Sequence, residues 1–267
     1  MSVELTSILQ NSVRNKLARG EVVSSMTVRL VRGVEIVRIA KTAGFDSIYV
    51  DMEHSSFDFD TTGQICIMAL EAGIAPFVRV PANKPEYIAR ALDGGALGVI
   101  APDVRSADEA RAVVGAAKFP PFGQRGVGGG SPHLQYRTFP AADANAALND
   151  ATMVVVQFES AAAVANAEEI VAVEGVDLVL IGTNDLMADM GIAGQFDHPT
   201  VREAYERTIA ACRRHGKHVG IGGLSSRPDL VGEFVRMGAR YVSTGTDLAF
   251  LLSAATQRAR QVADIRP

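Results

Sequence analysis

Short apolar runs alternate along this chain with longer amphipathic segments, in a rhythm that repeats eight times. The clearest run, Val154–Val156, is β-branched and continues directly into Gln157, Phe158 and Glu159. Continuous apolar runs of this length are typical of strands buried on both faces, as in a parallel sheet. The eight predicted strands cover residues 22–31, 47–51, 76–80, 98–101, 152–157, 177–181, 218–221 and 240–243.

A helix is predicted after each strand, and capping residues mark several of the helix ends. Ser106 and Glu109 form a capping-box pattern at the start of one helix, and Gly73 follows the end of another. The predicted helices cover residues 34–41, 60–71, 85–92, 106–118, 161–171, 200–214, 228–237 and 248–262.

Eight strand–helix units in 267 residues predict a (β/α)₈ TIM barrel, whose typical length is ~250 residues. A doubly wound sheet is the alternative, but the chain has no obvious composition break, which favours closure of the sheet. We expect a single barrel domain over residues 1–267. In such a barrel the carboxyl ends of all strands meet at one mouth, where ligands bind.

One connection interrupts this rhythm. Residues 119–151 contain Pro120-Pro121 and the glycine-rich run Arg125–Gly130. The glycines superficially resemble a dinucleotide-binding loop, but they follow a helix rather than a strand, which argues against that function. Connections of this length are usually functional or interfacial, so the alternatives are an active-site loop, a subunit contact or a neutral surface loop.

Composition narrows the class of protein. The chain is 48% hydrophobic and 21% charged with a net charge of −4 and no basic block, so neither a nucleic-acid nor a membrane partner is expected. No stretch approaches the ~18 consecutive apolar residues of a membrane span. Residues 1–16 lack the apolar core of a signal peptide. Two cysteines, Cys66 and Cys212, form neither a disulfide framework nor a zinc-finger spacing, so we expect a soluble cytoplasmic protein.

Polar side chains follow several of the predicted strands. Glu159 and Asp185, together with Gln157, would form an oxygen-rich site at the barrel mouth. Oxygen ligands select hard divalent cations such as Mg²⁺ or Mn²⁺, and two carboxylates leave coordination positions for substrate and water. The alternative is that Glu159 and Asp185 only cap the helices that follow them. We favour the metal site.

His54, Asp51 and Arg79 also lie at strand ends. Asp51 precedes His54 by three residues, and a carboxylate there can hold the imidazole in one tautomer; a solvent-exposed loop histidine is the alternative. Arg79 ends an apolar strand, where a buried guanidinium needs an anion, either a substrate or a neighbouring carboxylate. No lysine falls at the last residue of a predicted strand, which argues against Schiff-base chemistry. For carbonyl chemistry, electron withdrawal would therefore come from a metal.

Taken together, the motifs resemble those of the metal-dependent pyruvate aldolases of the HpcH/HpaI family, over about residues 20–255. The matching segments are Asp51–His54, Val78–Pro81, Arg125–Gly128, Gln157–Glu159 and Gly182–Leu186. The resemblance implies a barrel of the phosphoenolpyruvate/pyruvate type. It also implies a divalent metal (Mg²⁺ or Mn²⁺, with Co²⁺ or Zn²⁺ as alternatives) and no organic cofactor.

The resemblance further implies a role for each matching residue. Glu159 and Asp185 bind the metal, and Arg79 contacts the keto or enolate oxygen of pyruvate. His54 with Asp51 forms the acid–base pair. The expected substrate-binding residues are Arg79, Gln157, Gly182, Thr183, Asn184 and Leu224. Family members often carry Gly-Pro-Ala-Asp where this chain has Gly182–Asp185.

The implied activity is that of an aldehyde-lyase. It cleaves or forms 4-hydroxy-2-oxo acids through a metal-bound pyruvate enolate and releases pyruvate and an aldehyde. A homo-oligomer, hexamer or trimer, is implied, with the C-terminal helix at about residues 248–262 packing on a neighbour. The loop after Gly128 and the segment Gly222–Ser226 are expected to set acceptor specificity.

Three alternatives remain open at this stage. Gly222-Gly223 and Ser243–Thr246 follow the last two strands, where many barrels bind phosphate, so a phosphosugar enzyme is one alternative. A macrophomate-synthase-like enzyme that uses the same metal enolate is the second. The third, a catalytically silent barrel, is disfavoured by the intact set of Asp51, His54, Arg79, Glu159 and Asp185.

Overall fold

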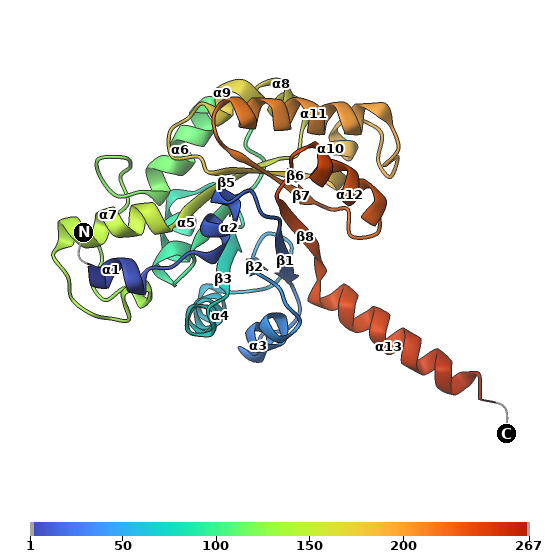
Figure 1. Ribbon diagram of the computed structural model, residues 1–267, viewed down its shortest axis with the longest axis horizontal. Helices are drawn as coiled ribbons and strands as arrows, with labels where there is room; N and C mark the ends of the chain where they lie inside the picture. Colours follow the sequence, from blue (N-terminus) through green and yellow to red (C-terminus); the bar gives the residue numbers. More distant parts are fainter. Residues whose placement is uncertain (1–2, 266–267) are drawn as a thin grey trace.

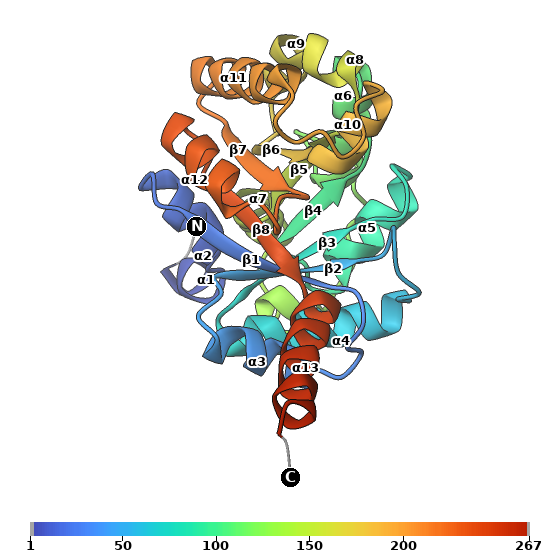
Figure 2. The ribbon, with the colours of Figure 1, turned by 90° about the vertical axis from the view of Figure 1, so that its right-hand side faces the viewer.

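The computed structural model describes residues 3–265 and confirms the predicted barrel (Figures 1 and 2). Eight parallel strands pair in sequence order, and β1 also pairs with β8, which closes the barrel. The strands are β1 (Val23–Val28), β2 (Ser47–Asp51), β3 (Ala75–Arg79), β4 (Gly98–Ala101), β5 (Met153–Phe158), β6 (Leu178–Gly182), β7 (His218–Gly222) and β8 (Tyr241–Thr246).

Helices surround the barrel and bury the outer faces of its strands. The helices are α1 (Val3–Ile8), α2 (Ser12–Ala18), α3 (Glu35–Thr42), α4 (Phe59–Ala72), α5 (Pro85–Asp93), α6 (Ala107–Ala117), η1 (Pro132–Leu134), α7 (Ala141–Ala151), α8 (Ala161–Ala165), α9 (Ala167–Val171), α10 (Thr183–Asp189), α11 (Pro199–Arg214), α12 (Pro228–Met237) and α13 (Asp247–Ala263).

The alternation of side chains along β5 explains how an apolar strand presents polar groups at the mouth. Met153 and Val155 pack in the cluster inside the barrel, whereas Val154 and Val156 belong to the cluster beneath the helices. Successive side chains of a strand point to opposite faces, so Gln157 continues the inner row. The apolar residues of the strand thus fill the barrel, and its last inward side chain is polar.

The amino end of the barrel is closed by α2. Val13 and Leu17 pack in the interior cluster. Asn11, which caps α2, donates from Nδ2 to the backbone oxygens of Leu97 (3.2 Å) and Ala151 (2.8 Å), which lie just before β4 and β5. Neither α1 nor α2 was predicted from the sequence, because these short helices carry too few apolar positions to show a period.

The connection between α6 and β5 is also anchored at the amino ends of the strands, opposite the mouth. Lys118 donates from Nζ to the backbone oxygens of Asn149 (2.7 Å) and Thr152 (2.6 Å). The segment contains η1 and α7, which were not predicted; the apolar positions of α7 are almost all alanine and give no clear helical period. Within its own chain, this connection is therefore not an active-site loop.

Other elements also differ from the sequence prediction: α10 was not predicted, and β8 ends at Thr246 rather than at residue 243. The first strand ends at Val28 rather than Val31, because the backbone N–H groups of residues 29–31 donate to the carboxylate of Asp247 instead of continuing the sheet. The helix predicted over 161–171 is broken at Asn166 into α8 and α9.

His133 in η1 gives the fold a pH-dependent component. Its Nε2 lies 2.9 Å from the backbone oxygen of Ala96, and burial lowers the pKa of the ring to about 4. The unfolded chain has a His pKa near ~6.5, so protonation favours the unfolded state. The stability that the neutral His133 ring contributes is complete above pH 6.5 and is lost as the pH falls toward 4.

When the pH is lowered from 7 to 5, we expect titration of His133 to reduce the unfolding free energy of the wild type by about 2 kcal/mol. Urea unfolding of the wild type and of His133→Gln at both pH values measures this, because the variant lacks the titrating group. An equal loss of stability in both proteins would contradict the assignment.

The C-terminal helix α13 extends away from the barrel (Figure 1). Phe250 stacks on Phe45 with ring centroids 6.1 Å apart, but Leu248, Leu251 and Leu252 are exposed. Within residues 3–265, no helix is both long and apolar enough to cross a membrane.

Candidate active site

The carboxyl ends of neighbouring strands bring the predicted site residues together at one mouth. Asp51 ends β2 and Arg79 ends β3, and the two residues are partners in the parallel register of these strands. Gln157 and Glu159 lie at the end of β5, and Asp185 lies in the first turn of α10, directly after β6. The convergence expected from the sequence is therefore present.

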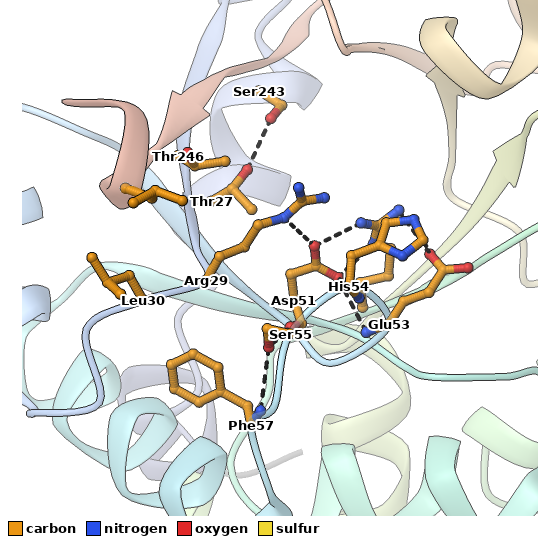
Figure 3. Close-up of polar contacts among 12 residues, drawn as sticks. Thr27, Arg29, Leu30, Asp51, Glu53, His54, Ser55, Phe57, Ser243 and Thr246 are labelled. Carbon is orange, nitrogen blue, oxygen red and sulfur yellow. Dashed lines mark hydrogen bonds and ion pairs between the residues drawn. The ribbon is translucent and has the colours of Figure 1, made fainter. Parts of the chain in front are cut away.

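A buried ion pair forms the centre of this site. Arg79 donates from Nε to Oδ1 of Asp51 (2.9 Å) and from Nη2 to Oδ2 (2.7 Å). Burial would raise the pKa of Asp51, but the hydrogen bonds and charge of Arg79 outweigh it and lower the pKa. Arg29 adds a bond from Nε to Oδ2 at 2.5 Å (Figure 3). Asp51 is therefore held as a carboxylate between two guanidinium groups.

The geometry differs from the predicted pairing of Asp51 with the imidazole of His54. Oδ1 of Asp51 accepts hydrogen bonds from the backbone N–H groups of Glu53 (3.2 Å) and His54 (3.3 Å), and so shapes the turn after β2. The His54 side chain is 49% exposed, and its Nε2 lies 3.8 Å from Oε2 of Glu53. Because Asp51 is already occupied by Arg29 and Arg79, Glu53 is the carboxylate beside the ring.

Glu159 is held on three sides. Its Oε1 accepts from Nε2 of Gln157 (2.7 Å) and lies 3.9 Å from Nη1 of Arg79, and its Oε2 accepts from the backbone N–H of Asp103 (2.9 Å). Burial and then the charge of Glu53 raise the pKa of Glu159 to about 7; Asp185 acts in the same direction, and Arg79 opposes the shift.

These electrostatics suit a cation. Glu53, Glu159 and Asp185 repel one another, and burial also raises the pKa of Glu53. Oε1 of Gln157 is buried and has no hydrogen-bond partner in the described part of the chain. A divalent ion on oxygen ligands would relieve this repulsion. Among residues 3–265 no group of three or more His, Cys, Asp or Glu side chains is arranged to hold a metal ion.

The start of α10 and the segment after β7 place three other predicted residues, Thr183, Asn184 and Leu224, differently. The hydroxyl of Thr183 is buried and donates to the backbone oxygen of Gly222 (2.7 Å), so it is not available to substrate. Asn184 is exposed and lies against Gly223. Leu224 is 1% exposed and packs in the main core cluster, so its side chain contributes to the core rather than to the mouth.

The first residue of α13, which follows β8 directly, argues against a phosphate at the turn after β1. The carboxylate of Asp247 accepts from the backbone N–H groups of Arg29 (2.9 Å), Leu30 (3.0 Å) and Val31 (2.7 Å). Three successive N–H groups of this kind form an anion-binding nest. Since the protein's own carboxylate fills the nest, a phosphate there would meet negative charge.

The sequence profile described as HpcH/HpaI aldolase/citrate lyase matches residues 32–254. The chain belongs to this family.

Individual members of the HpcH/HpaI family are similar over nearly the whole chain. A 4-hydroxy-4-methyl-2-oxoglutarate aldolase from Hapsidospora irregularis is 39% identical over 260 residues, covering 96% of each chain. A 2-dehydro-3,6-dideoxy-6-sulfogluconate aldolase from Pseudomonas putida is 37% identical over 215 residues, covering 80% of this chain and 83% of that one. The crystal structure of an HpcH/HpaI aldolase from Desulfitobacterium hafniense DCB-2 has a TM-score of 0.90 at 33% identity, covering 96% and 98% of the two chains. The protein is therefore an enzyme, a lyase of the aldolase type.

Three residues of this HpcH/HpaI site were missed by the sequence analysis. Arg29 follows the last residue of β1 and could have been found by the signal that identified Arg79, a lone guanidinium at the end of an apolar strand. It was missed because the first strand was predicted to continue to Val31. Asp103 contributes a backbone N–H, which no side-chain pattern reveals. Asp247 is the first residue of a helix, a position where acidic residues are common, so it gave no signal of a special role.

Gly182 keeps space for the two residues at the end of β5. A Cβ at this position would lie 2.8 Å from both Nε2 of Gln157 and Oε1 of Glu159. We expect Gly182→Ala to displace Glu159 and to weaken Mn²⁺ binding about 10-fold or more, since overpacking costs about 1–3 kcal/mol. Isothermal titration with Mn²⁺ measures this.

Gly115→Ala is the matched control for Gly182→Ala, because a Cβ on this helical glycine meets no atom within 4 Å. Equal Mn²⁺ affinity in the wild type and in Gly182→Ala would contradict the prediction.

Proposed function

We propose that this chain is a divalent-metal-dependent aldolase that cleaves or forms 4-hydroxy-2-oxo acids, with pyruvate and an aldehyde or ketone as the other reactants. The observation that carries the proposal is the mutual repulsion of Glu53, Glu159 and Asp185 beside the unpartnered oxygen of Gln157, with Arg79 among them. Two of the relatives described above act, by name, on substrates of this chemical type.

Glu159 and Asp185 are the residues that would hold the metal, which we expect to be Mg²⁺ or Mn²⁺. When bound, such an ion supplies Lewis-acid polarisation of the 2-oxo group. The two carboxylates fix the position of the ion, and Gln157 and the Asp103 backbone orient Glu159 for this purpose.

Arg79 supplies positive charge where the 2-oxo oxygen becomes negative. As the C3–C4 bond breaks, its electron pair moves toward that oxygen, and preorganised charge there lowers the barrier. Arg79 is 3% exposed and is fixed by two bonds to Asp51, so it needs no reorganisation during the reaction.

His54 moves the proton in this proposal. The C4 hydroxyl must lose its proton as the C3–C4 bond breaks, and C3 must gain one to give pyruvate. His54 is the half-exposed base at the mouth, and its Nε2 lies 3.8 Å from Oε2 of Glu53. A ring nitrogen of His54 accepts the hydroxyl proton, directly or through water.

The decisive experiment is a retro-aldol assay over a panel of 4-hydroxy-2-oxo acids, coupled to pyruvate detection. Activity should require Mg²⁺ or Mn²⁺, disappear with EDTA and return when the ion is restored. Full turnover in EDTA would contradict the metal requirement, and absence of pyruvate release from every substrate in the panel would contradict the aldolase activity.

We also propose that the enzyme is a cytoplasmic homo-oligomer in which α13 packs on a neighbouring subunit. The exposed residues Leu248, Leu251 and Leu252 on a helix that leaves the barrel support this. Cys66 and Cys212 are free and buried, which suits a reducing compartment. Light scattering that gives the mass of one 28.3 kDa chain would contradict the oligomer.

A further inference from the structure

Arg29 lies at the mouth without an established role. It follows β1, and its side chain is 33% exposed, whereas that of Arg79 is 4% exposed. Its Nε donates to Oδ2 of Asp51 at 2.5 Å. Figure 3 draws this bond at Nε of Arg29 and, among the residues shown, none at the two terminal nitrogens. One edge of the group is thus used by the protein, and the other is left for a ligand.

The charge of Arg29 is only partly balanced. Arg79 takes both oxygens of Asp51 and has a second carboxylate, Glu53, with Oε2 2.8 Å from its Nη1. Among residues 3–265, Arg29 forms an ion pair with Asp51 alone, through an oxygen that it shares with Arg79. The mouth therefore contains a guanidinium with spare capacity to bind an anion.

Arg29 is also held in place. The carboxylate of Asp247 accepts from the backbone N–H groups of residues 29–31, so the chain cannot easily carry the guanidinium away from the mouth. Asp247 meets the backbone of Arg29 and leaves its terminal nitrogens to other partners. A fixed, forked donor of this kind is suited to bidentate recognition of a carboxylate.

Contacts place Arg29 at the distal end of a bound substrate. A line of ion pairs runs from Glu159 to Arg79 (3.9 Å), from Arg79 to Asp51 (2.7 Å) and from Asp51 to Arg29 (2.5 Å). The 2-oxo end of the substrate belongs beside Glu159 and Arg79. The Arg79–Asp51 pair separates that end from Arg29.

We infer that Arg29 binds a second carboxylate carried on C4 of the substrate, which makes the preferred substrates dicarboxylic 4-hydroxy-2-oxo acids. This inference rests on the proposed aldolase function. It means that the carbonyl compound released with pyruvate is itself a 2-oxo acid. Arg29 is then the residue that separates such substrates from those with an alkyl group at C4.

The test compares two substrates that differ only at C5. In 4-hydroxy-2-oxoglutarate this atom is a carboxylate carbon, and in 4-hydroxy-2-oxopentanoate it is a methyl group. We expect Arg29→Gln to lower kcat/KM for the first substrate about 10- to 100-fold more than for the second, as for loss of a hydrogen bond between charged groups. Arg29→Lys should recover part of the loss.

Arg38→Gln is the matched control, because it removes one positive charge from an exposed position on α3. Titration with Mn²⁺ should give the same affinity in the wild type, Arg29→Gln and Arg38→Gln, which shows that the cation end of the site is intact.

An equal loss for both substrates in Arg29→Gln would overturn the inference, since Arg29 would then act only through Asp51. Unchanged kcat/KM for the dicarboxylate would also overturn it. If the wild type cleaves neither substrate, nor any other 4-hydroxy-2-oxo acid, with added Mg²⁺ or Mn²⁺, the proposed aldolase function fails rather than the placement of Arg29.

Discussion

Glu159→Gln should reduce metal-dependent turnover by about 1,000-fold or more, because the metal's Lewis acidity is worth several kcal/mol in the transition state. Glutamine has nearly the same shape, but its single amide oxygen can accept from only one of the two donors, Gln157 or the backbone N–H of Asp103. The variant therefore removes the negative charge and one accepted hydrogen bond, with almost no change in side-chain volume. Isothermal titration should show loss of Mn²⁺ binding in parallel with the loss of pyruvate release.

The matched control for this substitution is Glu169→Gln, on the exposed surface of α9. It removes the same charge far from the mouth and should keep full activity and Mn²⁺ affinity. Retention of both properties in Glu159→Gln would show that this carboxylate is not a metal ligand.

Arg79→Lys should lower kcat about 100- to 1,000-fold, the cost of removing one preorganised donor from a developing oxyanion. Lysine keeps the charge but cannot donate to both oxygens of Asp51 while facing the substrate. Stability should also fall, by about 1–3 kcal/mol, because a buried carboxylate loses a charged hydrogen-bond partner. Mn²⁺ binding should survive, since Glu159 and Asp185 are untouched.

Steady-state kinetics, thermal unfolding and Mn²⁺ titration separate the roles of Arg79. A loss of stability with unchanged kcat would make this residue purely structural. Arg38→Lys on the surface of α3 is the control for the arginine-to-lysine change itself and should match the wild type in all three measurements.

The strand ends are the part of the site that sequence predicts well. Asp51, Arg79 and Glu159 each follow an apolar run, and the period of two in a strand fixes which of them face inward. A barrel then brings these positions together, whatever the details of the helices. This is why the convergence of residues that are far apart in sequence could be predicted without coordinates.

The partner of each polar group could not be predicted in the same way. Asp51 and His54 are three residues apart, yet the carboxylate bonds to Arg29 and Arg79 because these come from neighbouring strands on either side of β2. The N–H of Asp103 reaches Glu159 through backbone geometry alone. The hydrogen-bond partner of each polar group depends on which strands lie side by side in the fold, and spacing along the sequence does not show this.

Closure of the amino end of the barrel by α2 has a consequence for the order in which products are released. Val13 and Leu17 close the amino end of the barrel, and packed side chains such as Val155 fill the space above them. Molecules can therefore enter and leave only through the mouth. If the 2-oxo end of the substrate sits deepest, the fragment carrying C4 must depart first and pyruvate last. Product inhibition should then be competitive for pyruvate and noncompetitive for the other product.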